Sequence, residues 1–281
     1  MPMLLIKGSF HLKDTQPDGD TVHFTADNPD DWQLVGGKNP IQLTAASHAL
    51  RLEGIDAPET HYHGAHQPLQ QAHAAAAELL KWLGFTNVQR EPDETVTAST
   101  PASTPGYILT RGADMYGRVI ALVGKGNPPG TSGTDISVGV PLLKQTANHH
   151  LVSTGLAYPT FYRSLFADLR AELTTAAQQA QTAGKGLWPD DVTTSGVKIT
   201  GLSSITDEAV ILPKLFRRLV DFLKLGMPIT SFPAYLAGKE DKFTVLSTGQ
   251  RFAGLHEVVD VSNGSTVRMT HPADDLLFDE G

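Results

Sequence analysis

The chain of 281 residues contains no cysteine, which excludes disulfide bonds and thiolate metal sites. It also contains no apolar run of about 18 residues, the length that a membrane-spanning helix requires. The first residues lack the basic start and the long apolar core of a signal peptide. We therefore expect no membrane partner, and a cytoplasmic location unless a leader has been trimmed from a secreted protein.

Basic residues are also few in comparison with acidic residues. Lysine and arginine number 22 against 30 aspartates and glutamates, which gives a formal net charge of −8. Proteins that bind nucleic acid tightly usually carry a basic footprint, because phosphate contacts dominate the affinity. The acidic balance argues against tight, general nucleic-acid binding. It is compatible with an enzyme that binds a nucleic-acid substrate modestly or acts on small substrates.

Three short segments carry charged side chains next to strand-like runs. They are residues 18–21 (DGDT), residues 50–60 (LRLEGIDAPET) and residues 114–118 (DMYGR). Calcium prefers hard oxygen ligands, and guanidinium groups match the charge of a phosphate bidentately. Carboxylates and arginines together are what calcium-assisted phosphodiester cleavage needs. We interpret the three segments as parts of one nuclease site.

Candidate metal ligands lie in the first two segments. Asp20 and Asp56 could supply carboxylates to Ca²⁺, and the carbonyl of Ala57 could supply a third oxygen.

Candidate catalytic residues come from the second and third segments. Arg51 and Arg118 suit the stabilisation of phosphate charge, because guanidinium groups stay protonated at neutral pH. Glu59 could orient or deprotonate the attacking water.

The segment 50–60 poses a geometric difficulty. Strict alternation along a strand would send Arg51 and Asp56 to opposite faces. They converge only if the strand bends or bulges, and Gly54 can accommodate a bend at little cost. Pro58 lacks a donor for the ladder and should end the strand, which leaves Glu59 on the following turn.

These motifs resemble the staphylococcal nuclease (thermonuclease) family, whose pattern is DGDT, then R-x4-D-x-P-E-T, then D-x-Y-G-R. Residues 151–157 (LVSTGLA) and 184–188 (GKGLW) resemble later parts of the family, so that the resemblance covers roughly residues 4–188. It implies an α+β fold, an OB-type five-stranded barrel carrying helices. It also implies a Ca²⁺-dependent endonuclease that hydrolyses DNA and RNA and leaves 3′-phosphate ends.

The resemblance also assigns roles, residue by residue. Asp20 and Asp56 become calcium ligands, Glu59 the general base, and Arg51 and Arg118 the phosphate contacts.

Aromatic residues near these motifs are candidate substrate contacts. Tyr116 becomes a contact to the nucleotide by the same resemblance. For the aromatic expected after GLA, Tyr158, Phe161 and Tyr162 compete, and we take Tyr158 and Tyr162 as the candidates. Met115 stands where the family has a lysine, so one basic contact is absent.

The expected layout divides the chain into three parts. Residues 1–190 form the catalytic domain, 191–201 a linker and 202–281 a small α+β domain of unknown role. Strands are expected at 4–12, 20–25, 48–56, 107–110 and 119–123, and helices at 67–83, near 141–155 and at 163–183. The insertions at 27–40 and 91–106 are expected to be surface loops, the second of them flexible.

The C-terminal part predicts a helix with an apolar stripe from Leu212 to Leu223, followed by strands that turn at Asn263 and Gly264. The opposite side of the helix is basic. It could contact nucleic acid or a membrane surface. The simpler interpretation is that the stripe packs on its own domain and leaves the basic side chains in solvent. Residues 274–280 are expected to be an acidic solvated tail.

Two functions from different classes remain open. The first is the calcium-dependent nuclease. The second is a non-catalytic OB-type module that binds single-stranded nucleic acid or a protein partner. A pure binding module has no need for a metal-ligand pair and a further carboxylate, which favours the enzyme. The preference between DNA and RNA and the oligomeric state stay open.

Overall fold

The computed structural model describes residues 1–36 and 47–279. The expected loop at 27–40 therefore lies partly outside the described residues, and its first part contains the short 3-10 helix η1 (Pro29–Leu34). The strands of the first half are β1 (Pro2–His11), β2 (Thr21–Ala26), β3 (Ser47–Leu52), β4 (Ile55–Asp56), β5 (Thr86–Arg90), β6 (Val96–Thr100), β7 (Ser103–Ala113), β8 (Val119–Lys125) and β9 (Thr134–Ser137).

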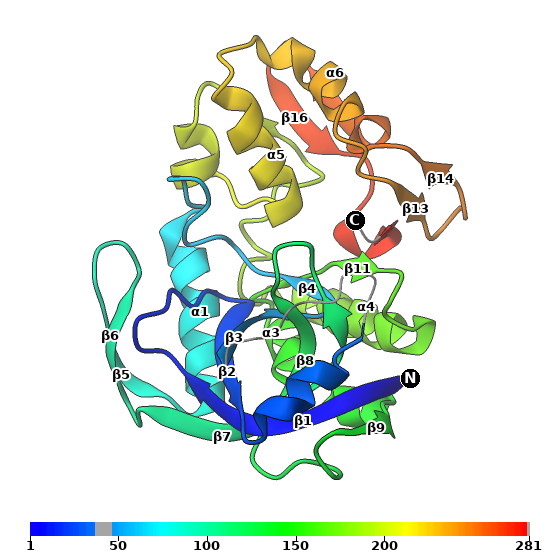
Figure 1. Ribbon diagram of the computed structural model, residues 1–281. Helices are drawn as coiled ribbons and strands as arrows, with labels where there is room; N and C mark the ends of the chain where they lie inside the picture. The colour runs from blue at the N-terminus through cyan, green and yellow to red at the C-terminus, as the bar shows by residue number, and fades with distance from the viewer. Residues whose placement is uncertain (37–46, 280–281) are drawn as a thin grey trace.

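Five of these strands close into a barrel (Figure 1). β1 pairs with both β2 and β7, β2 pairs with β3, and β7 pairs with β8, all in antiparallel fashion. The circuit is completed by a parallel pairing of β3 with β8, in which Arg51 is the partner of Ile120. β9 pairs in antiparallel fashion with the first residues of β1, from Pro2 to Leu5. The structure is thus a five-stranded mixed barrel with helices, which confirms the expected α+β, OB-type fold class.

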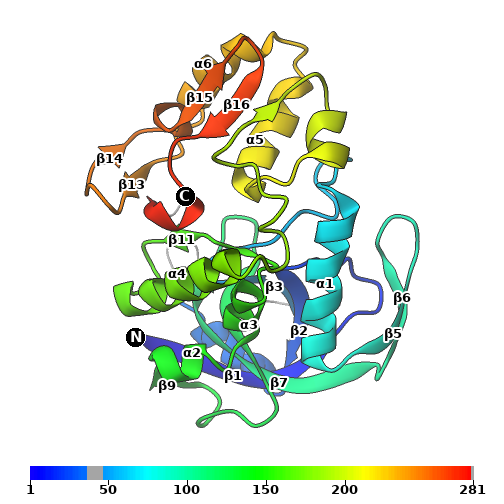
Figure 2. The same ribbon diagram turned by 180° about the vertical axis from the view of Figure 1, so that it is seen from behind.

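Helices cover one side of the barrel (Figure 2). They are α1 (Leu69–Leu83), α2 (Val140–Leu143), α3 (Ala147–Ser153) and α4 (Ala167–Thr182). The single helix expected near 141–155 is divided in two, because Thr146 caps a new helix: its side chain accepts a hydrogen bond from the His149 amide at 3.4 Å. α1 ends at Gly84, whose φ of +96° is the left-handed conformation of a glycine C-cap.

The insertion at 91–106 differs from its prediction. β5 and β6 form an ordered hairpin within and before it, and β7 begins at Ser103. Val96 is fully buried, and the Arg90 guanidinium donates to the carbonyl and carboxylate oxygens of Glu94. These contacts stabilise the turn between β5 and β6. Composition alone misled here, because threonine is β-branched and favours strands once a neighbouring strand is available.

The second half contributes short elements. The strands are β10 (Tyr158–Pro159), β11 (Phe161–Tyr162), β12 (Val197–Lys198), β13 (Phe243–Val245), β14 (Arg251–Phe252), β15 (Val259–Ser262), β16 (Thr266–Met269) and β17 (Leu276–Phe278). The helices are α5 (Pro213–Leu223), α6 (Phe232–Ala237), the π-helix η2 (Ser204–Glu208) and the 3-10 helices η3 (Ile229–Ser231), η4 (Leu255–Glu257) and η5 (Ala273–Asp275).

The apolar stripe of α5 packs in a core, as the simpler interpretation predicted, but the basic side chains are not left in solvent, because Lys214 and Arg218 pair with the Asp241 carboxylate. Leu215, Phe216, Leu219, Val220 and Phe222 are buried in a second core. This core also contains Tyr158 and Leu187 from the first part of the chain. The division into 1–190, 191–201 and 202–281 remains our proposal; the two parts share packing at their junction.

The structure of the C-terminal residues differs from the prediction. Residues 274–280 were expected to be a solvated tail, but β17 within them pairs in parallel with β11 and in antiparallel fashion with β13. Leu276 and Phe278 are buried, and the Asp279 carboxylate forms ion pairs with Arg163 and Arg251. The apolar residues among the acidic ones explain the difference, because they complete a small sheet with β11 and β13.

No helix among the described residues is long and apolar enough to cross a membrane.

Candidate active site

The site begins at a bend in the chain. β3 ends at Leu52 and β4 resumes at Ile55, and between them Gly54 has a φ of +77°. This left-handed conformation is open to glycine at little cost. The bend brings the Arg51 guanidinium within 2.6 Å of an Asp56 carboxylate oxygen, as the prediction about Gly54 required.

Asp20 approaches the bend from the start of β2. The backbone amide of Ala57 donates a hydrogen bond to Oδ2 of Asp20 at 2.7 Å, and the Leu52 amide donates to the Asp20 carbonyl at 2.8 Å. Arg51 also forms an ion pair with the Asp20 carboxylate. Asp20 and Asp56 therefore converge on one guanidinium, although Asp20 precedes β2 and Asp56 lies in β4.

Both carboxylates are buried, Asp56 completely. Burial opposes the ionisation of Asp56, but the guanidinium groups of Arg217 and Arg51 outweigh it and hold the pKa of Asp56 below its usual value. Burial raises the pKa of Asp18, two residues before Asp20, to about 6, and the charge of Asp20 adds to the effect. The site thus concentrates negative charge that only bound cationic groups can compensate.

Glu59 lies on the turn after Pro58, as predicted. Gln67, which is buried, holds this turn: its side-chain oxygen accepts from the Glu59 backbone amide at 3.2 Å, and its backbone amide donates to the Glu59 carbonyl at 2.9 Å. Burial raises the pKa of Glu59 to about 7; Arg217 opposes the rise, and the charges of Asp18, Asp20 and Asp56 add to it. A carboxyl group with a pKa in this range can exchange a proton near neutral pH.

Sequence reasoning missed the residue that contacts Asp56 and Glu59 together. Arg217, on α5, donates to the two carboxylate oxygens of Asp56 at 2.9 and 3.1 Å and also pairs with Glu59. The basic side of the predicted helix was a signal for it. That signal did not say which acidic group, 161 residues earlier, the arginine would meet.

Arg118 and Tyr116 lie on the turn between β7 and β8. The Nε of Arg118 donates to Asp114 at 2.8 Å, and its guanidinium lies 5.9 Å from the ring centre of Tyr116. Tyr116 is 77 % exposed. Arg118 immediately precedes Val119, the strand partner of Leu50, whereas Arg51 is the partner of Ile120, one residue further along β8. Its charge is engaged by Asp114, however, and no contact joins it to the carboxylates described above.

The two tyrosines proposed as substrate contacts differ in accessibility. Tyr158 pairs with Asp56 through the β10–β4 ladder, but its ring is buried and its hydroxyl donates to Asp191 at 2.7 Å. Burial and the charge of Asp191 raise the pKa of that hydroxyl well above its usual value. Tyr162 is partly exposed, with Lys214 5.8 Å from its ring centre. A substrate contact stays a prediction for both, and burial speaks against Tyr158.

The donor set fits calcium. Asp20 and Asp56 offer hard oxygen ligands that already face a common positive group, and the backbone amide of Ala57, the residue after Asp56, is hydrogen-bonded to Asp20. Among the described residues no group of three histidine, aspartate or glutamate side chains is arranged to hold a metal ion. Any ion here would therefore need oxygens from the backbone, from water or from a phosphate as well.

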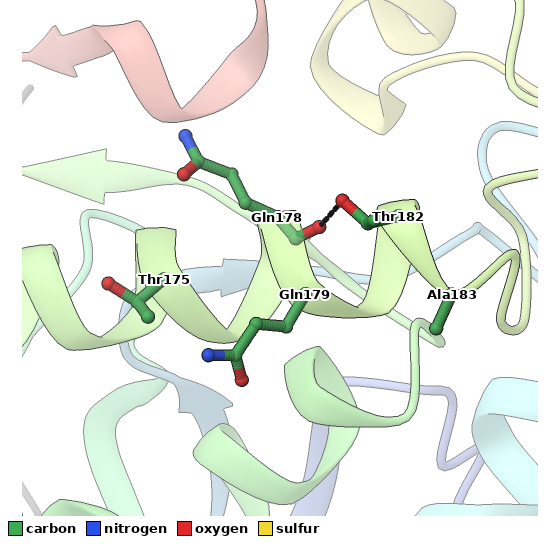
Figure 3. Close-up of a pocket in the computed structure, with 5 residues that line it drawn as sticks. All are labelled: Thr175, Gln178, Gln179, Thr182 and Ala183. Atoms are coloured by element: carbon green, nitrogen blue, oxygen red, sulfur yellow. Dashed lines mark hydrogen bonds between the residues drawn. The ribbon is translucent and has the colours of Figure 1, made fainter.

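A hollow on the surface lies elsewhere. It has a volume of about 360 Å³ and is lined by Thr175, Gln178, Gln179, Thr182 and Ala183 of α4 (Figure 3). The lining comes from one face of one helix and includes no titratable side chain. It offers no chemistry comparable to the carboxylates at the end of β3, and we place the candidate active site at the latter.

Fold and site together define a class: a small mixed barrel with buried carboxylates and arginines gathered where one strand bends. The sequence model of the staphylococcal nuclease homologue family matches residues 49–190, just over half of the chain. The chain belongs to this family. The match includes Arg51, Asp56, Glu59 and Arg118, whereas Arg217 lies beyond it. No match is found among curated proteins.

Proposed function

We propose that this protein is a calcium-dependent nuclease that hydrolyses phosphodiester bonds of DNA, RNA or both. The observation that carries the proposal is the convergence of Asp20, Asp56 and Glu59 around the bend at Gly54, with Arg51 bound to two of the three. Membership of the family supports a nuclease-like module with a nucleic-acid substrate. Calcium dependence and the individual roles are our assignment.

In the proposed reaction Asp20, Asp56 and the Ala57 carbonyl would hold the ion, which supplies charge neutralisation at the phosphate when bound. Glu59 accepts the proton of the attacking water. The water oxygen bonds to phosphorus, the bond from phosphorus to the 5′ oxygen breaks, and the 5′ oxygen takes up a proton. The phosphate then remains on the 3′ end.

Charge stabilisation falls to the arginines. Arg51 is placed beside the carboxylates, and we assign Arg118 to the same task at the edge of the site. A phosphodiester that is attacked by water gains charge on its non-bridging oxygens, and guanidinium groups bind such oxygens in pairs. Tyr116 and Tyr162 are our candidates for contacts to the nucleotide.

The binding-module alternative explains the site less well. Burial of charged groups costs free energy that is not always recovered by their mutual attraction. A module that only binds nucleic acid gains nothing from several carboxylates at its binding surface, because they repel phosphate. An enzyme that needs a metal ion and a base has a use for each of them.

The test is hydrolysis of single-stranded DNA and of RNA by the purified full chain, with calcium and with excess chelator. We expect cleavage with calcium only, and products whose 3′ ends become extendable by a polymerase after phosphatase treatment. Retention of the oligonucleotide in a gel without cleavage, at several pH values and with other divalent ions, would instead identify a binding module. Cleavage that persists in chelator would remove the ion from the proposal.

A further inference from the structure

We propose that Arg217 is a third phosphate-binding arginine of this active site, contributed by the C-terminal segment. The inference rests on the proposed nuclease function. It extends that function to a residue that lies outside the family match. The C-terminal segment is then part of the catalytic apparatus, with a role that neither its composition nor the family assigns.

The contacts of Arg217 are the first reason. Its guanidinium binds both oxygens of Asp56, the proposed metal ligand, and also binds Glu59, the proposed base. A group that touches both lies beside the space where the ion, the attacking water and the phosphate must meet. An arginine presents five N–H donors in a planar fork, so it can keep a carboxylate partner while it binds phosphate oxygens.

Charge is the second reason. Asp18, Asp20, Asp56 and Glu59 gather at the site in a protein of net charge −8. Arg51 alone leaves this cluster strongly negative, which would repel a phosphodiester. Arg118 is engaged by Asp114 on the turn. Arg217 is the additional positive charge placed among the carboxylates themselves, and its side chain keeps 23 % of its surface exposed.

The packing of α5 is the third reason. It holds Arg217 in the site as a permanent residue, and does not suit a blocking group that the substrate must displace. One side of the helix is buried in the second core. The other side is fastened to the turn that carries the base: Tyr62 donates to Asp221 at 3.1 Å, and Lys224 donates to the His63 carbonyl at 2.6 Å.

A buried amide connects the same two regions. Gln67, which holds the Glu59 turn, also donates from its side chain to the carbonyl of Ile211 at 2.7 Å, just before α5 begins. Movement of α5 away from the site would break these links and expose the second core. Figures 1 and 2 agree that α5 lies at the end of the barrel where β4 and the start of α1 are located.

The experiment compares Arg217→Ala and Arg217→Lys with the native chain, and uses Arg218→Ala as the matched control. Arg218 is the next residue of α5, but its guanidinium binds Asp241 at 2.7 Å through two nitrogens, away from the carboxylates. Each variant is assayed for cleavage of single-stranded DNA with calcium. Binding of a short fluorescent single-stranded oligodeoxynucleotide is measured separately in excess chelator, where no turnover is expected.

We expect Arg217→Ala to lower kcat by about 100-fold or more, as for removal of one preorganised donor. Its Kd for the oligonucleotide should rise by about 10-fold or more. Arg217→Lys should retain part of the binding and less of kcat, because lysine keeps the charge but not the fork. Added guanidinium ion at low concentration should restore part of the activity of Arg217→Ala. Arg218→Ala should match the native chain in both assays.

Contrary outcomes separate the two proposals. Cleavage by Arg217→Ala at or above the native rate would overturn the inference, while the nuclease function stands. A loss shared equally by Arg218→Ala would show a folding effect and also overturn it. A native chain that binds but never cleaves ends the nuclease proposal; weaker binding by Arg217→Ala would then still support a phosphate contact. A native chain that neither cleaves nor binds overturns both.

Discussion

Replacement of Gly54 by alanine tests whether the site depends on the bend between β3 and β4. The φ of +77° costs a residue with a Cβ about 1–2 kcal/mol. The new Cβ would lie 2.8 Å from Leu165 Cδ2 and 2.9 Å from Leu173 Cδ1. Both leucines are fully buried, so relief of the overlap adds about 1–3 kcal/mol. We expect the free energy of unfolding to fall by about 2–5 kcal/mol.

The assay is urea denaturation, with tryptophan fluorescence as the signal for unfolding. Gly126→Ala is the control, because Gly126 has a similar φ of +73° but nothing within 4 Å of the added Cβ. It should lose only about 1–2 kcal/mol. Equal losses for the two variants, or a loss below about 0.5 kcal/mol for Gly54→Ala, would refute the reasoning about strain and overlap. In an assay without urea, Gly54→Ala should also cleave DNA more slowly, because a change in the bend disrupts the ion pair between Arg51 and Asp56.

Three further outcomes follow from the same contacts. Gln67→Ala leaves the partly buried Glu59 amide and the buried Ile211 carbonyl without their partners and should cost about 2–4 kcal/mol in urea denaturation; a cost below about 0.5 kcal/mol would contradict it. Excess calcium should raise the Tm of the native chain but not of Asp56→Asn, and equal rises would place the ion elsewhere. Burial, with the charges of His11 and His48, lowers the pKa of His23. At this residue the unfolded chain then binds more protons, so the contribution of His23 to stability is complete above about pH 6.5 and is lost below it, and His23→Gln should remove that part of the pH dependence in urea titrations at several pH values.

Local patterns predicted the strands, whereas the barrel that they form was implied by the resemblance to the nuclease family. Alternating apolar residues placed the strands, and the conflict between alternation and the need for Arg51 to meet Asp56 pointed to a bend at Gly54, which the structure contains. The Asn263–Gly264 turn between β15 and β16 was also predicted correctly, with φ values of +50° and +73°. These features depend on residues a few positions away in the chain, and the sequence gives those residues directly.

Features that depend on distant partners could not be predicted in the same way. The threonine-rich insertion became a hairpin, and the acidic end became β17, because each found a strand to pair with. The pairing of Arg217 with Asp56 and Glu59 depends on how α5 docks on the barrel. A sequence shows that a helix has a basic side, but the partner of that side is decided by packing of the whole chain.

The most direct test of the account is the single-turnover rate of Glu59→Gln on single-stranded DNA with calcium. Glutamine preserves the size of the side chain and can still accept a hydrogen bond, but it cannot accept the proton of the attacking water. Glu78→Gln is the control, since Glu78 lies on α1 and pairs with Lys81 and His150. We predict a loss of about 100-fold or more for Glu59→Gln, with Glu78→Gln unchanged. A rate within about 2-fold of the native chain would contradict the role of Glu59 and, with it, the proposed mechanism.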